Sequence, residues 1–205
     1  IETQSTAKEE IEAEPFRLDF VKKALETIRD SRAVDGKVKE KMDLRWGANV
    51  SLQADEEILC DPTVATNAVV NMIRNAARDN VGATRILVSV NREGSALAIR
   101  VYDNGNGMPE KFLDEEGDAF IFRKGVSHSG STGLGLADLP ERLPEDVEFS
   151  VVSREKDTAG QFGDVHEYRV NGAAPMAIEE TKDFATIFEF RLPIVRRQAA
   201  MQEAA

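Results

Sequence analysis

Three asparagines recur every four residues, at Asn67, Asn71 and Asn75. On a helix this spacing stacks their side chains along one side. An amide oxygen is a neutral, hard donor that suits Mg²⁺, an ion that keeps several waters and bridges phosphates. Asn71 and Asn75, one turn apart, can therefore face one triphosphate. Asn67 taken alone is more simply explained as part of a solvated helix face.

A second candidate site is the sequence DNGNGM at residues 103–108, directly after a predicted strand. Asn and Gly are common in ordinary turns, so the segment alone predicts only a turn. A buried carboxylate at a strand end can also accept a hydrogen bond from the exocyclic amine of adenine. Guanine has an acceptor at that position and would be repelled. In this interpretation Asp103 selects adenine, and Gly105 and Gly107 let the backbone approach the ring.

The third segment is GSTGLGLA at residues 130–137. Glycines that open a helix let backbone N–H groups point at phosphates, with help from the helix dipole. A single G-x-G before apolar residues is a weak signal, so this segment indicates a phosphate site only in combination with the other two segments.

The asparagines lie on the best-defined helix of the sequence. Asp61 is placed to cap its N-terminus, and Pro62 occupies the first helical position. An apolar stripe lies roughly opposite the asparagine row and consists of Ala65, Ala68, Val69, Met72 and Ala76. A helix packed on the core by this stripe would present its amides to a cleft.

Two runs of alternating apolar residues predict the β-hairpin that positions Asp103. Its inward residues are Ile86, Val88 and Val90, then Leu97, Ile99 and Val101, with a turn at 91–94. Further strands are expected at 15–18, 41–45, 50–54, 147–153, 165–170 and 185–193, with a turn at Gly47 and a helix over 19–30. The long segment 108–132 is typical of a functional lid. Segment 154–183 is interpreted as an extended hairpin or insertion.

Composition limits the possible functions. The chain has 205 residues, 41% of them apolar, which suffices for one domain with a proper core. Its net charge of −11 argues against a nucleic-acid partner, because a phosphate backbone requires a basic face. No apolar run is long enough for a membrane helix, so no membrane contact is expected of this fragment. The single Cys60 excludes an intrachain disulfide framework.

Taken together and in this order, the three segments resemble the GHKL ATP-binding superfamily. They are most similar to the catalytic and ATP-binding domain of bacterial sensor histidine kinases. The resemblance implies an α/β (α+β) two-layer sandwich, with a mixed β-sheet and helices on one face, the Bergerat-type ATP-binding fold. We expect this domain at 15–194, with the insertion at about 154–183. Residues 1–14 are expected to be a lead-in from a missing upstream domain, and 195–205 a C-terminal tail.

The resemblance also assigns roles to residues. Asn75 matches the asparagine that ligates Mg²⁺, and Arg78 the basic residue that reaches the phosphates. Asp103, Gly105 and Gly107 match the adenine-binding box. The phosphate-facing box and lid are matched by Thr132, Gly133, Leu134, Gly135 and Lys124. The implied cofactors are therefore ATP and Mg²⁺.

Two positions depart from the family pattern, and a third discriminates between its branches. Asp79 replaces an aromatic residue or histidine that packs near the nucleotide, and Pro140 shortens or kinks the helix after the second glycine box. Asn71 stands where the gyrase, mismatch-repair and chaperone branches have a glutamate that activates water. An amide cannot act as that base. Asn71 and Asn75 are thus assigned to phosphoryl transfer to another acceptor rather than to ATP hydrolysis.

The leading hypothesis is a histidine kinase catalytic domain, a phosphotransferase of two-component signalling. Its acceptor histidine would lie on a dimerisation domain upstream or on a partner, because neither His128 nor His166 resembles the acceptor motif. A response regulator would act downstream. The lone thiol and the use of ATP suit the cytoplasm, and the anchoring of the parent protein stays open. The alternatives are a degenerate, non-catalytic docking or phosphotransfer scaffold and an anti-sigma-type serine kinase.

Overall fold

The computed structural model describes residues 43–50, 52–53, 55–77, 81–108, 145–170 and 183–196. The strands are β1 (Asp43–Asn49), β2 (Glu56–Ile58), β3 (Arg85–Glu93), β4 (Ala96–Asp103), β5 (Glu148–Ser153), β6 (His166–Val170) and β7 (Thr186–Arg196). One helix, α3 (Pro62–Ala76), belongs to the described part. In that part, no helix combines the length and the apolar character needed to cross a membrane.

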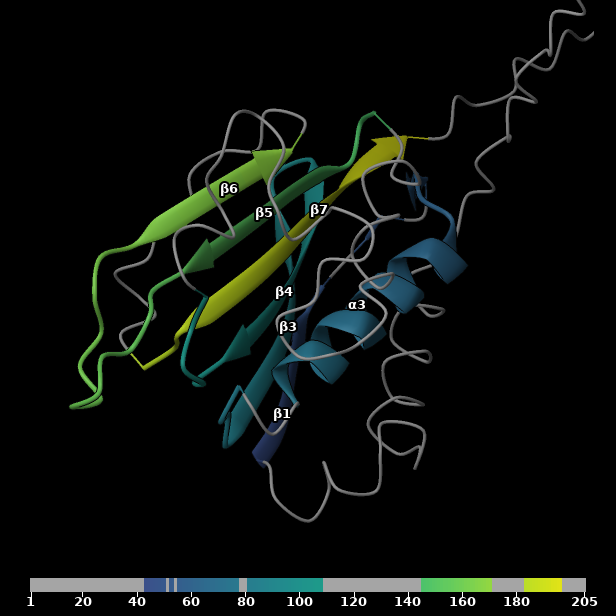
Figure 1. The fold of residues 1–205 in the computed structure, drawn as a ribbon. Coiled ribbons are helices and arrows are strands. Elements are labelled where there is room, and N and C mark those ends of the chain that lie inside the picture. Colours follow the sequence, from purple (N-terminus) through teal and green to yellow (C-terminus); the bar gives the residue numbers. More distant parts are fainter. Residues whose placement is uncertain are drawn as a thin grey trace, which may run out of the picture.

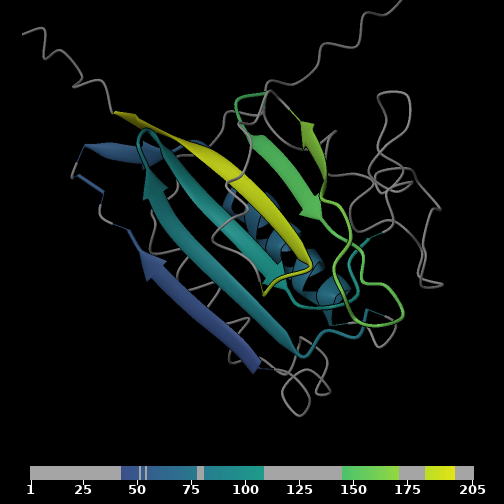
Figure 2. The ribbon, with the colours of Figure 1, turned by 90° about the vertical axis from the view of Figure 1, so that its left-hand side faces the viewer.

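The strands form a single mixed sheet in the order β1-β3-β4-β7-β5-β6, with β2 paired to β7. β1 runs parallel to β3. The other neighbouring pairs along the sheet are antiparallel. Helix α3 lies across one face of the sheet (Figure 1), and the view in Figure 2 shows it behind the strands. The predicted two-layer architecture is confirmed.

The core lies between α3 and the sheet. All five residues of the predicted stripe on α3 are buried, and Ile73 joins them. The sheet contributes the inward residues of the predicted hairpin together with Phe149, Val151, Phe188, Phe190 and Leu192. Each such large apolar side chain contributes about 1.5–3 kcal/mol when it leaves water. This packing fixes the helix against the strands, and with it the orientation of the asparagine row.

The prediction of a turn at Gly47 is wrong. β1 runs through Gly47, which is paired with Ser89 of β3, and the strand predicted at 50–54 is replaced by the short β2 farther along. Gly47 is exposed, and a Cβ added there would meet no atom within 4 Å. Gly47 therefore lies in an open part of a strand. No turn is needed there, because β1 pairs in parallel with β3, which is distant in the sequence, and does not form a hairpin.

Elsewhere the strand predictions match with small shifts. The predicted strands at 147–153, 165–170 and 185–193 correspond to β5, β6 and β7, although β7 continues to Arg196, into the segment expected to be a tail. In the β3–β4 hairpin the strands extend as far as Glu93 and Ala96, so the turn is only Gly94–Ser95. The elements predicted at 15–30 lie outside the described residues.

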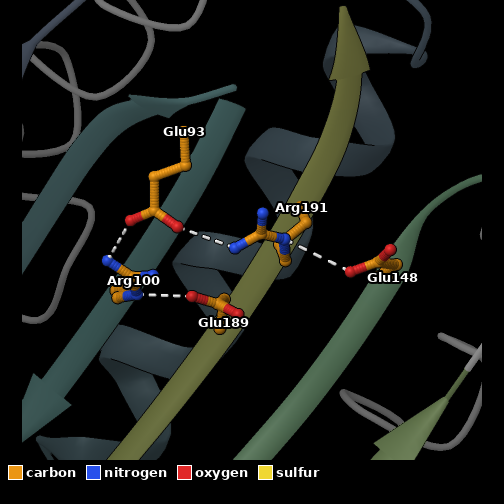
Figure 3. A network of polar contacts seen from close by, with 5 residues as sticks. All are labelled: Glu93, Arg100, Glu148, Glu189 and Arg191. Atoms are coloured by element: carbon orange, nitrogen blue, oxygen red, sulfur yellow. Dashed lines mark hydrogen bonds and ion pairs between the residues drawn. The ribbon is translucent and has the colours of Figure 1, made fainter. Parts of the chain in front are cut away.

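The sheet face opposite α3 carries a network of charged side chains (Figure 3). Glu93 pairs with Arg100 at 2.6 Å and with Arg191 at 2.7 Å. Arg100 also contacts Glu189, and Arg191 lies 3.2 Å from Glu148. Arg100 and Glu189 are directly opposite across β4 and β7, as Arg191 and Glu148 are across β7 and β5. The network thus links four adjacent strands through cross-strand pairs.

Candidate functional site

Asp103 is the last residue of β4, and its side chain is only 3% exposed. Its register partners are the apolar Ile86 on β3 and Thr186 on β7. The carboxylate accepts a hydrogen bond of 2.9 Å from the Gly105 N–H, and Thr186 donates a second one from its hydroxyl. A carboxylate offers about four lone-pair positions. Asp103 therefore keeps capacity for a further donor.

The surroundings raise the pKa of Asp103 from 3.8 to about 6. Burial is the main cause, because the charged form loses its hydration. The Gly105 N–H, the positive charge of Lys156 and the Thr186 hydroxyl oppose this effect and lower the pKa. At neutral pH the group is still mostly ionised, and an ionised carboxylate can only accept hydrogen bonds. A buried acid with a strongly perturbed pKa at a loop is typical of functional sites.

The loop after Asp103 is fixed to the segment that leads into β3. The Asn104 side-chain oxygen accepts hydrogen bonds from the backbone N–H groups of Thr84 (2.9 Å) and Arg85 (2.8 Å), and its amide nitrogen donates to the Thr84 hydroxyl at 2.9 Å. The Asn106 N–H donates to the Val81 carbonyl at 2.8 Å. The loop is thereby ordered by the protein itself.

Both glycines of the predicted adenine box are required by close packing. A Cβ on Gly105 would lie 2.6 Å from the carbonyl oxygen and from a side-chain carbon of Val81. Gly107 has φ +77°, and a Cβ there would lie 2.0 Å from the Arg154 carbonyl oxygen. The sequence interpretation attributed these glycines to the approach of a ring. In the structure, backbone atoms of neighbouring segments already occupy the space that a side chain at either position would need.

Sequence reasoning missed Thr186 and Ser153. Thr186 lies beside Asp103, and its hydroxyl is 3.0 Å from that of Ser153. Ser153 in turn accepts a hydrogen bond of 2.8 Å from the Met108 N–H. Both residues stand at strand ends that the sequence placed well, but only the pairing of β4 with β7 and β5 brings them together. No spacing in the sequence signals this strand pairing.

The three asparagines of α3 differ in exposure. Asn67 is exposed on the side opposite the buried stripe, whereas Asn71 and Asn75 are half-buried. The helix ends at Ala76, so the basic residue predicted to follow, Arg78, lies outside the described residues together with Asp79. The same holds for Lys124, Thr132, Gly133, Leu134, Gly135 and Pro140, and their assigned roles stay predictions.

A family model described as "Histidine kinase-, DNA gyrase B-, and HSP90-like ATPase" matches residues 60–195. The chain is 33% identical over 92 residues to the nitrogen regulation protein NtrY of Azorhizobium caulinodans, covering 42% of this chain and 11% of that protein. It is 41% identical over 70 residues to the sensor-type histidine kinase PrrB of Mycobacterium leprae, covering 34% and 15%. The chain therefore spans only a small part of these relatives.

Solved structures of similar fold include the mycobacterial sensor histidine kinase MprB, with a TM-score of 0.52 at 17% identity, covering 87% of this chain and 94% of that one. Full-length ShkA in complex with AMPPNP gives a TM-score of 0.53 at 19% identity, covering 90% and 32%. At this identity the likeness shows the fold. Because the family model matches residues 60–195 of the 205, this chain belongs to the histidine kinase-, DNA gyrase B- and HSP90-like ATPases.

Proposed function

We propose that this chain binds Mg–ATP and presents the γ-phosphoryl group to a histidine on a dimerisation domain outside the chain. The observation that carries the proposal is the buried carboxylate of Asp103. It lies at a strand end, is held by the Gly105 N–H, and has acceptor capacity left. An acceptor-only group fits the donating exocyclic amine of adenine and opposes the carbonyl oxygen that guanine has in the same place.

Support for the metal comes from the chemistry of α3. Asn75 is a half-buried amide at the edge of the buried stripe of α3, one turn from the half-buried Asn71. One amide oxygen, together with phosphate oxygens and waters, is a donor set that suits Mg²⁺. Bound there, the ion would neutralise charge on the phosphates. We assign Asn75 as the protein ligand and leave the phosphate contacts with Arg78, Lys124 and the second glycine box, as the family pattern implies.

Phosphoryl transfer rather than hydrolysis is proposed because of Asn71. Its amide has no group that titrates near neutral pH and cannot take a proton from water. Transfer of a phosphoryl group depends mainly on positioning and on charge neutralisation, so no further protein base is needed in this domain. The acceptor histidine and the response regulator would belong to other domains, and the reaction would take place in the cytoplasm, where ATP is available.

The test is calorimetry of ATP with Mg²⁺ on the wild type and on Asp103→Asn. The variant loses a hydrogen bond to a charged acceptor, worth about 2–3 kcal/mol, so affinity should fall roughly 30- to 150-fold. Asp146→Asn is a matched control at an exposed aspartate and should bind normally. Unchanged affinity in Asp103→Asn would overturn the adenine assignment.

The metal assignment has its own matched pair on one helix. Asn75→Ala should weaken the dependence of ATP affinity on Mg²⁺, whereas Asn67→Ala, at an exposed position on α3, should leave it unchanged. Titrations with and without Mg²⁺ measure the difference. An unaltered metal dependence in Asn75→Ala would place the ion elsewhere.

Transfer itself is tested by mixing the chain with a candidate acceptor domain and radiolabelled ATP. The expected product is an acid-labile phosphoramidate on the acceptor. If the chain binds no ATP at all, the result favours the non-catalytic scaffold. If the label is stable to acid and sits on serine, it favours the serine kinase.

A further inference from the structure

The insertion predicted at 154–183 has no role in the function proposed above. Its described first part leaves β5, makes a tight turn and returns as β6 at the edge of the sheet. We call residues 154–165 the β5–β6 hairpin loop; in Figure 1 it leads from the end of β5 to the start of β6.

The β5–β6 hairpin loop is well ordered by its own contacts. The Asp157 carboxylate accepts hydrogen bonds of 2.8 Å from the N–H groups of Ala159 and Gln161. The Phe162 ring packs under two cations, with the Arg154 guanidinium 3.9 Å and the Lys156 ammonium 4.9 Å from its centre. Such contacts hold the two long side chains in place. The loop therefore presents Lys156 in one defined position.

That position is against the loop at 103–108. The Lys156 N–H donates to the Asn106 carbonyl at 2.8 Å, and its ammonium donates to the Asn104 carbonyl at 2.7 Å. The Arg154 carbonyl fills the space where a side chain on Gly107 would lie. Since Asn104 and Asn106 are bonded on their other side to residues 81–85, the 103–108 loop is held between two segments.

Lys156 also brings a charge to the buried carboxylate. Asp103 faces the neutral Thr186 on β7 and the apolar Ile86 on β3. Within its own loop it meets the Gly105 N–H. Lys156 supplies a positive charge that lowers the pKa of Asp103 against the effect of burial. In the described part of the chain, Asp103 has no direct ion pair, so this longer-range charge is its compensation.

We infer that the β5–β6 hairpin loop is a clamp on the 103–108 loop, and that Lys156 is a positioning residue that keeps Asp103 anionic and in place for adenine. The inference rests on the proposed ATP site. In this role Lys156 undergoes no chemical change. It fixes two carbonyl groups and stabilises the charge on a neighbouring acid.

The test compares Lys156→Gln, which removes the charge, with Lys156→Arg, which keeps it. Lys156→Met is a second neutral variant whose long apolar stem can still pack near Phe162, in case the glutamine variant folds poorly. Glu155→Gln changes an exposed charge on the same hairpin loop and serves as the control. Two quantities are measured in each full chain: the titration of the Asp103 carboxyl carbon by NMR without nucleotide, and ATP affinity between pH 5.5 and 8.5.

In the wild type the carboxyl group should titrate near pH 6, and ATP affinity should fall below that pH. Both midpoints should move to higher pH in the neutral variants. A shift of about one pH unit would leave roughly half of the carboxyl groups ionised at pH 7 and lower ATP affinity there about twofold. Lys156→Arg and Glu155→Gln should match the wild type. A role in packing alone would weaken binding without moving the midpoint.

The two measurements separate this inference from the proposed function. Identical NMR titrations in the wild type and both neutral variants would overturn the role of Lys156, whatever the affinity for ATP. A shifted NMR titration in a chain that binds no ATP would support the clamp and its charge but overturn the ATP site on which its purpose depends.

Discussion

The glycine turns at the two ends of strand β4 differ in how closely they are packed. β4 begins after the turn at Gly94 and ends at Asp103 before the loop that contains Gly107. Both glycines have a positive φ, +62° and +77°. A Cβ on Gly94 would meet nothing within 4 Å, whereas one on Gly107 would lie 2.0 Å from a backbone oxygen. The first turn only reverses the chain, and the second is packed into its surroundings.

The acids near the two ends differ in the same way; Glu93, the last residue of β3, pairs with the first residue of β4, and Asp103 is the last residue of β4. Burial alone would raise the pKa of Glu93, but its ion pairs with Arg100 and Arg191 outweigh that effect and lower it. The pKa of Asp103 is raised to about 6, mainly by burial. An acid that stabilises the sheet is neutralised by arginine, and the acid of the candidate site is left with acceptor capacity.

Glu189 shows that a raised pKa is not enough to mark a site. It is 2% exposed, and burial raises its pKa although Arg100 lies directly against it. Glu189 stands in the middle of β7 within the charged network, whereas Asp103 stands at a strand end beside a loop. The comparison therefore depends on three features together: burial, the lack of a direct ion pair among the described residues, and position.

The largest effect is expected from alanine at the two glycines. Gly107→Ala introduces both strain at positive φ and a clash with the Arg154 carbonyl, and should lower the free energy of unfolding by more than about 3 kcal/mol. Gly94→Ala introduces only the strain, about 1 kcal/mol. Denaturant unfolding of both variants measures the contrast. Equal losses would mean that the packing at Gly107 contributes nothing.

Replacing Asp103 or Glu93 by its neutral amide should change the free energy of unfolding by a smaller amount, and in opposite directions. The pKa of Asp103 rises on folding from 3.8 to about 6, which corresponds to about 3 kcal/mol lost when the group is ionised. Asp103→Asn should therefore stabilise the fold at pH 8 by about 1–3 kcal/mol, while it weakens ATP binding. The gain should shrink below pH 6 and vanish below pH 3.8, where the wild-type acid is neutral in both states.

Glu93→Gln should instead destabilise the chain at pH 8, by no more than about 1 kcal/mol because the side chain is one-third exposed. The pKa of Glu93 is lowered on folding, so this loss should fade as the pH drops through that lowered pKa. Urea unfolding at pH 8 and pH 4 compares the two variants. The same sign for both at pH 8 would contradict the contrast between the two ends of β4.

The sequence predicted the elements that carry strong periodicity. The apolar stripe of α3 and the alternation of β3 and β4 led correctly to the helix, the hairpin and the position of Asp103 at its end. The strand at Gly47 was misjudged, because parallel pairing with β3 has no local signal. Thr186, Ser153 and Lys156 were missed for a similar reason. Their position near Asp103 or its loop depends on the order of strands in the sheet, and residues about 50 to 80 positions apart carry no spacing that reveals it.

In the proposed ATP site, a carboxyl group with a pKa of about 6 would also tie nucleotide exchange to proton exchange. If adenine binds only to the ionised carboxylate, nucleotide binding in mildly acidic solution releases the proton from the fraction of Asp103 groups that are protonated. Nucleotide dissociation takes that proton up again. Occupancy then follows the acidity of the compartment as well as the supply of ligand. A signalling protein built around this domain would inherit that coupling from one strand end, without any separate acid sensor.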